Sequence, residues 1–144
     1  MVELDKFIKI FEGLTSAYGQ TVKTDQFSEK GKHKTKSFTI SNPVTKKLWR
    51  EHLEGKDPAL GIVPINKENK CKWGCIDIDI YNLDHKQLLQ KIQSLNFPLI
   101  TFRSKSGGAH LFLFADKFIP AFLMKDKLEQ MATALAAFTT QIAT

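Results

Sequence analysis

A strictly alternating segment, residues 75–80 (Cys-Ile-Asp-Ile-Asp-Ile), constrains this chain more than any other feature. Successive side chains of a β-strand point to opposite faces of a sheet, so the isoleucines share one face and Asp77 and Asp79 share the other. Two ionised carboxylates roughly 7 Å apart repel each other. A divalent cation between them removes this repulsion, and Mg²⁺ or Mn²⁺ prefers such oxygen ligands. Asp77 and Asp79 are therefore candidate metal-binding and catalytic residues, the alternative being an amphipathic strand whose polar face is only solvated.

A second candidate site is a turn rich in glycine, hydroxyl groups and positive charge, which begins at Arg103 and leads into His110. Consecutive glycines allow positive φ and let backbone N–H groups converge on an anion, as a triphosphate requires. Its candidate phosphate-binding residues are Arg103, Ser104, Lys105, Ser106, Gly107 and Gly108. We expect His110 to donate a hydrogen bond to a phosphate oxygen. The alternative is that His110 is a core residue, because it shares a strand face with the apolar Phe112 and Phe114.

The order of predicted elements indicates an α+β fold, a mainly antiparallel sheet flanked by helices. At 144 residues the chain suits one domain, residues 1–144, with a basic, flexible loop over residues 15–36. Residues 60–65 and 71–80 are predicted to pair as a hairpin. The expected helices cover residues 3–14, 41–54, 84–95 and 120 onward; the expected strands cover residues 37–40, 60–65, 71–80, 99–103 and 109–115.

The basic residues gather in the first third of the chain, whose overall net charge is +6. This distribution is compatible with a polyanionic partner. The candidate nucleic-acid-binding residues are Lys32, Lys34, Lys36, Lys46, Lys47 and Arg50. Lysine-rich stretches are equally often solvated loops, and that alternative stays open. Apolar runs are too short to span a membrane, and the acidic start is unlike a signal peptide, so we expect a cytoplasmic protein without a membrane partner.

In combination these segments resemble the archaeo-eukaryotic primase (primase-polymerase) superfamily, most closely the primase domains of TOTE conflict systems and mobile elements. The resemblance rests on residues 48–55, 61–65, 71–81 and 103–114. It implies that Asp77 and Asp79 form the metal-holding Asp-x-Asp motif, and that His110 closes a motif contacting the phosphates of the incoming nucleotide. The family's third motif, a hydrophobic residue followed by Asp on a later strand, matches neither Asp116 nor Asp126. The chain is thus expected to be the N-terminal half of a primase-polymerase core.

The function implied by the resemblance is that of a DNA primase or DNA-directed polymerase, a nucleotidyltransferase that uses Mg²⁺ or Mn²⁺. Its expected partners are a DNA template and primer, nucleoside triphosphates, and a helicase or further domains of the same replication protein. A bacterial, phage or mobile-element source is expected. Two alternatives remain: a non-catalytic module or primase remnant that binds nucleic acid or nucleotide, and a metal-dependent nuclease. The nuclease is disfavoured because no convincing general base or lysine lies near the carboxylates.

Overall fold

The computed structural model describes residues 2–143, and the side chains of residues 3–136. The chain divides into two compact units, Met1–Asn69 and Lys70–Thr144. Each unit contains one three-stranded antiparallel sheet. With helices on both units, the α+β prediction is confirmed. Within the described residues, no helix is both long and apolar enough to cross a membrane.

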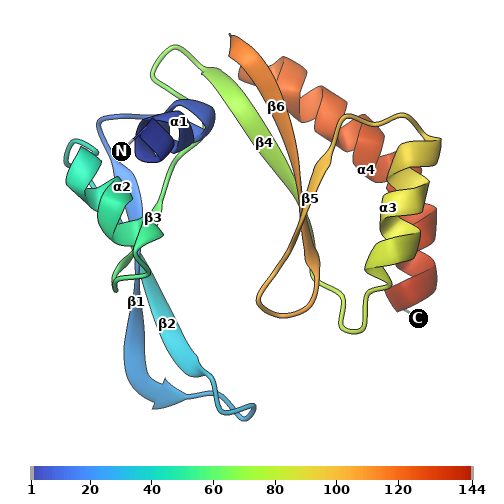
Figure 1. Cartoon of the computed structure of the whole chain (residues 1–144), viewed down its shortest axis with the longest axis horizontal. Helices are drawn as coiled ribbons and strands as arrows, with labels where there is room; N and C mark the ends of the chain where they lie inside the picture. Colours follow the sequence, from blue (N-terminus) through green and yellow to red (C-terminus); the bar gives the residue numbers. More distant parts are fainter. Residues whose placement is uncertain (1, 144) are drawn as a thin grey trace. The chain divides into compact units, whose positions relative to one another are not determined.

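The first unit is built around the sheet order β2-β1-β3. The two long strands form a hairpin that extends beyond the short third strand, away from both helices of this unit (Figure 1). Its elements are α1 (Val2–Phe11), β1 (Tyr18–Phe27), β2 (His33–Ile40), α2 (Lys46–Leu53) and β3 (Ala59–Gly61).

The predicted flexible loop over residues 15–36 is wrong, because β1 and the first half of β2 lie within it. Seven of the eight residues of β2 are exposed, so the strand carries no apolar alternation that a sequence pattern would detect. The hairpin is held by its backbone ladder, in which Val22 faces Lys36. A side-chain hydrogen bond of 2.9 Å between the hydroxyls of Thr21 and Ser37 adds to it. Cross-strand pairing, more than hydrophobic burial, thus stabilises the hairpin.

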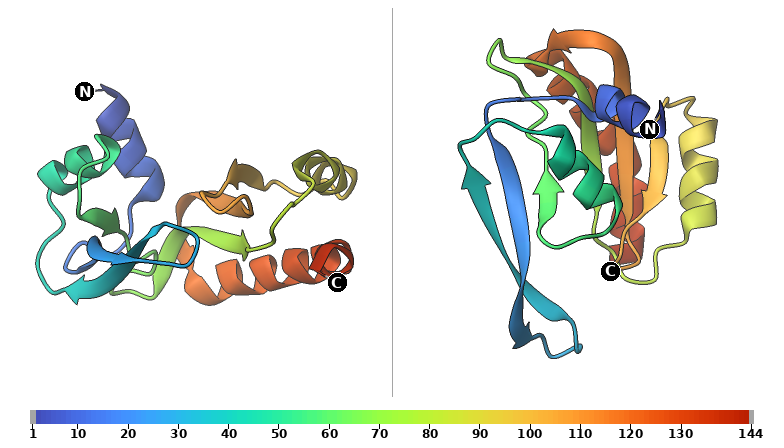
Figure 2. Two further views of the ribbon diagram at one scale, coloured as in Figure 1. Left: turned by 90° about the horizontal axis from the view of Figure 1, so that it is seen from below. Right: turned by 60° about the vertical axis from the view of Figure 1, so that its left-hand side comes forward.

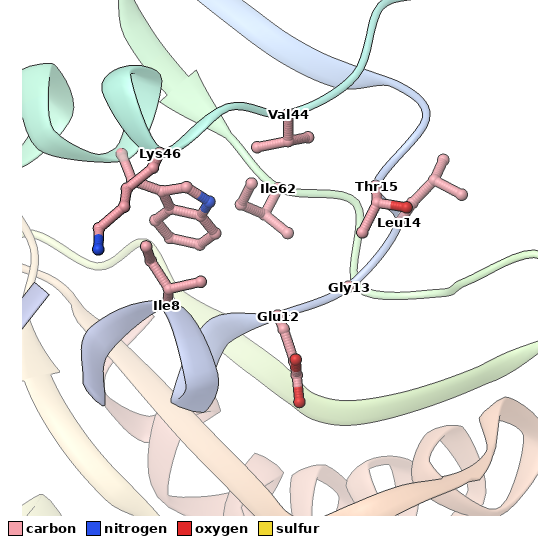
Figure 3. A pocket seen from close by; sticks show the side chains of 9 residues that line it. Ile8, Glu12, Gly13, Leu14, Thr15, Val44, Lys46 and Ile62 are labelled. Carbon is pink, nitrogen blue, oxygen red and sulfur yellow. The ribbon is translucent and has the colours of Figure 1, made fainter. Parts of the chain in front are cut away.

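The helix predicted after Ser41 begins later than expected, at Lys46. The Thr45 hydroxyl accepts a hydrogen bond from the Leu48 backbone N–H (3.3 Å) and so caps the helix. This places Trp49 inward, only 6% exposed and edge-on to Phe7, with ring centroids 5.9 Å apart. Beside the indole is an open hollow of about 200 Å³, toward which Ile8, Val44 and Ile62 point from three segments (Figure 3).

The hairpin predicted between residues 60–65 and 71–80 is also wrong. The first of these segments contributes β3, which pairs with β1, Leu60 facing Gln20. The second contributes β4, which pairs with β6 in the other sheet. Strands that are neighbours in the sequence usually pair, but here each strand pairs with one that is more distant in the sequence.

The second unit has the strand order β4-β6-β5, with the long β6 in the centre. The helix α4 runs along one face of this sheet (Figures 1 and 2). The core side chains of this unit come from that face of the sheet and from both helices: Ile78, Leu88, Ile92, Leu111, Leu113, Met124, Met131 and Leu135. The elements are β4 (Lys70–Ile78), α3 (His85–Ser94), β5 (Ile100–Arg103), β6 (Ala109–Pro120) and α4 (Ala121–Ala143).

Candidate functional site

The end of β4 presents the two aspartates on the side of the sheet opposite the core. Ile78 is buried, whereas Asp77 and Asp79 on either side of it are exposed, so the predicted two-faced segment is confirmed. The strand is shorter than expected, since it ends at Ile78 and Asp79 lies just beyond it. The carboxylates therefore stand at a strand end, where a ligand can approach them.

His110 lies directly opposite Asp77 in the ladder between β4 and β6. The imidazole Nε2 is 3.3 Å from the Asp77 Oδ1 atom, and the two side chains are 44% and 69% exposed, respectively. The core-histidine alternative is therefore wrong. Antiparallel pairing brings together two residues that are 33 positions apart in the sequence.

The glycine turn joins β5 to β6 and is closed by two backbone hydrogen bonds. The Ser104 N–H donates to the Gly108 carbonyl (3.0 Å), and the Gly107 N–H donates to the Ser104 carbonyl (3.1 Å). Gly107 has φ +92°, a conformation that side-chain-bearing residues rarely adopt. The Ser106 hydroxyl lies 3.1 Å from that of Ser104 and donates to Asp79 Oδ1 at 3.5 Å. This contact connects the turn to the second carboxylate.

Lys105 and Arg103, both predicted to bind phosphate, differ in their position relative to the turn. Lys105 is exposed at the turn. Arg103 faces Ala109, which belongs to the core side of the sheet, whereas Phe102 faces His110. Alternation along β5 therefore directs Arg103 to the face opposite His110. The structure brings together the carboxylates, the serines, the glycines and His110, but not Arg103.

The basic residues of the first unit separate into two sets. Lys46 forms an ion pair with Asp5 (2.7 Å), and Lys47 with Glu51 (3.8 Å). The Lys46 ammonium, through its hydrogen bond and charge, lowers the pKa of Asp5. By contrast, none of the ion pairs found in residues 3–136 involves the hairpin lysines 32, 34 and 36. The hairpin lysines thus lack the ion pairs that Lys46 and Lys47 have.

His85 is a site residue that sequence reasoning missed. It is the first residue of α3, which is capped by Asp84, and its Nε2 donates to the Gly108 carbonyl at 3.0 Å. That carbonyl also accepts a hydrogen bond from the Ser104 N–H, so His85, which is not part of the turn, helps to stabilise it. The cap on α3 was readable in the sequence, but a contact spanning 23 residues was not.

His85→Ala is expected to loosen the turn without removing any predicted ligand. Loss of one hydrogen bond of ordinary strength, about 0.5–1.5 kcal/mol, should speed hydrogen exchange at the Ser104 and Gly107 amides by roughly 2- to 10-fold. Exchange measured by NMR checks this. Lys86→Ala, at the neighbouring exposed position, serves as the control and should leave both rates unchanged. Equal exchange in wild type and His85→Ala would show that the imidazole does not hold the turn.

Cys75 reports on the charge of Asp77, two residues away on the same strand. Burial of its sulfur, and then the Asp77 carboxylate, raise the pKa of the Cys75 thiol. Asp77→Asn removes the negative charge, so the thiol pKa should fall and more thiolate should be present at pH 8. Alkylation by iodoacetamide should then be roughly 2- to 10-fold faster. Mass spectrometry in a Cys71→Ser background follows this single thiol; an unchanged rate would contradict the predicted coupling.

An aromatic cluster lies on the same sheet face as Asp77 and His110. Phe112 is at its centre, with ring centroids of Phe102 at 5.4 Å, Phe114 at 5.7 Å and Trp73 at 6.0 Å. The His110 ring is 6.3 Å from Phe112. Phe102 is 49% exposed and faces His110 in the ladder between β5 and β6. Such a surface suits contact with the flat face of a nucleobase.

The donor set fits a hard divalent cation shared with a substrate. Among the described residues, no cluster of three or more His, Cys, Asp or Glu side chains is arranged to hold a metal ion. The protein therefore offers two carboxylates. Mg²⁺ is commonly held by one or two carboxylates, with the remaining positions filled by water and substrate phosphates. The hydroxyl- and glycine-rich turn beside Asp79 is where such phosphates would be received.

A model of the family described as "TOTE conflict system, Archaeo-Eukaryotic Primase domain" matches residues 5–144. No curated protein sequence matches the chain significantly. The family match includes both the paired carboxylates and the glycine turn with its histidine, and it extends over both compact units. The chain belongs to the archaeo-eukaryotic primase domain family of TOTE conflict systems.

Proposed function

We propose that this domain is the nucleotide- and metal-binding part of a nucleotidyltransferase that extends a primer, or an initiating nucleotide, on a DNA template. The observation that carries the proposal is the meeting of Asp77, His110 and the turn of residues 104–108 at one end of a sheet. Paired carboxylates and a phosphate-type turn are the parts that phosphoryl transfer requires, since its catalysis is mostly positioning and charge stabilisation.

The residues have separate roles in this proposal. Asp77 and Asp79 hold Mg²⁺ or Mn²⁺, which when bound neutralises charge on the triphosphate and the leaving pyrophosphate. His110 donates to a phosphate oxygen, because its Nε2 lies 3.3 Å from an Asp77 carboxylate oxygen and is therefore next to any phosphate that Asp77 shares through the cation. Ser104, Ser106, Lys105 and the glycine backbone of the turn supply further phosphate contacts. Arg103 has a lesser part, since strand alternation turns it to the other face.

The DNA partner is assigned to the basic residues of the first unit. Lys32, Lys34 and Lys36 on the hairpin carry the main contact in this proposal, because no ion pair of the described residues neutralises them. A smaller share falls to Lys46 and Lys47, because both already pair with acidic side chains. Arg50, on the same helix, is assigned to the contact with them. Contacts of this kind with phosphates make binding strongly dependent on salt.

Incorporation of a labelled nucleotide into a primed DNA template tests the proposal. The expected result is extension that requires Mg²⁺ or Mn²⁺ and stops when EDTA is added. Absence of extension together with retained, salt-sensitive DNA binding would instead identify a non-catalytic binding module. That second function is favoured by the presence of only two clustered carboxylates among the described residues. Shortening of the labelled strand, in place of extension, would identify a nuclease.

A further inference from the structure

The hairpin of β1 and β2 extends past the sheet to which it belongs. β3 pairs only with residues 19–21 of β1, so residues 22–36 continue as a ribbon of two strands (Figure 1). β2 is exposed along nearly its whole length. A two-stranded ribbon without a hydrophobic face buries little apolar surface and is only marginally stable by itself. Its extension into solvent is therefore best explained by a binding role.

The ribbon carries an excess of positive charge. Residues 22–36 contain five lysines and two acidic residues, a net charge of +3. Lys34 and Lys36 are two positions apart on β2, so their side chains leave from the same face, roughly 7 Å apart. The exposed ring of Phe38 continues that face. On the opposite face are the hydroxyls of Thr21 and Ser37, which also present donors and acceptors.

The tip of the ribbon is held in one conformation. The rings of Phe27 and His33 are in tilted contact, with centroids 4.3 Å apart, and the His33 Nδ1 atom lies 2.8 Å from the Thr24 carbonyl. The Ser28 N–H donates to the Lys32 carbonyl at 2.7 Å, which closes the turn. A preorganised arm loses less conformational entropy on binding than a mobile loop does.

We propose that the ribbon of residues 22–36 inserts into the major groove of double-stranded DNA, with Lys34 and Lys36 on the phosphates. The major groove of B-DNA is about 12 Å wide and admits a two-stranded β-ribbon, whereas the minor groove is about 6 Å wide. The major groove of A-form RNA is too narrow and deep for side chains to read, which directs the proposal to a DNA duplex. It rests on the proposed function in one respect: the duplex is the paired part of the same template and primer.

Binding of the full chain to a fluorescein-labelled DNA duplex, followed by anisotropy across a series of salt concentrations, tests this inference. The variant carries Lys34→Ala together with Lys36→Ala. The matched control carries Lys86→Ala together with Lys91→Ala, two exposed lysines of α3. The hairpin variant should bind the duplex about 10-fold more weakly, and its slope of log K against log salt should be less steep by about 2. The control should retain the affinity and slope of wild type.

Chemical footprinting identifies the groove. Guanine N7 is exposed in the major groove, so wild type should protect it from dimethyl sulfate and the hairpin variant should not. The inference is overturned if the control loses as much affinity as the hairpin variant, if N7 is not protected, or if single-stranded DNA of the same sequence shows the same loss as duplex. Metal-dependent extension of a primed template by wild type tests the proposed function separately, and metal-dependent nucleotide binding without DNA tests its nucleotide site, so the two proposals can fail independently.

Discussion

Replacement of Asp77 or Asp79 with asparagine will lower the affinity for Mn²⁺, in the presence of a nucleoside triphosphate, by about 100-fold or more. Each substitution removes one negative charge at contact distance from a divalent cation. Even with an effective dielectric constant near 20, one such unit charge is worth a few kcal/mol, and about 3 kcal/mol corresponds to roughly 100-fold. Asparagine keeps the size and a carbonyl oxygen, so packing changes little.

Mn²⁺ binding is measured by electron paramagnetic resonance of the free ion, which needs no catalytic turnover. Asp116→Asn is the matched control, because Asp116 is exposed on β6 and lies outside the proposed site. Its affinity should equal that of wild type. If Asp77→Asn and Asp79→Asn bind Mn²⁺ as Asp116→Asn does, then the two-carboxylate metal site does not exist. Thermal unfolding of all three variants should agree within a few degrees, since the substituted side chains are exposed.

Gly108→Ala is the second substitution for which we expect a large effect. A Cβ atom built on Gly108 would overlap the backbone carbonyl oxygen of Ile78, the last residue of β4. Because this neighbour is backbone, relief requires the turn or the strand end to move. Overpacking of this kind costs about 1–3 kcal/mol, which lowers the melting temperature by roughly 5–15 °C for a unit of this size. The displaced turn should also lose its contact with Asp79, and with it most nucleotide affinity.

Gly107→Ala is an instructive comparison for this prediction. Gly107 also has no side chain, but a Cβ there would meet nothing within 4 Å, and only its positive φ is unfavourable for alanine. Its destabilisation should stay near 1–2 kcal/mol, the cost of a left-handed backbone. Calorimetry of both variants separates steric overlap from backbone strain. Equal stability of Gly108→Ala and wild type would contradict the close approach of the turn to Ile78.

The alternation of residues 75–80 predicted the most about this protein, because side-chain direction on a strand depends only on local geometry. It correctly placed Ile78 in the core and Asp77 and Asp79 outside it. The glycine turn was predictable for the same reason, since the positive φ of Gly107 is a local requirement. The cap at Asp84 likewise depends on neighbouring atoms alone.

The main failures concern strands that are stabilised by partners distant in the sequence. β1 and β2 bury little, so their stability depends on a cross-strand ladder that no periodic apolar signal marks. The pairing of β3 with β1, and of β4 with β6, brings together segments tens of residues apart. Arg103 was grouped with the turn by sequence proximity, yet the register of β5 with β6 directs it to the other face.

By itself, the sequence determined the chemical nature of the site: two carboxylates on one face, a phosphate-type turn and a histidine two residues after its last glycine. These are properties of residue type and short-range geometry. Only the tertiary structure decided that His110 faces Asp77, that Ser106 reaches Asp79, and that His85 holds the turn. Each of those contacts joins residues more than 20 positions apart, and hydrogen-bond register between strands, which no local pattern encodes, decides whether they meet.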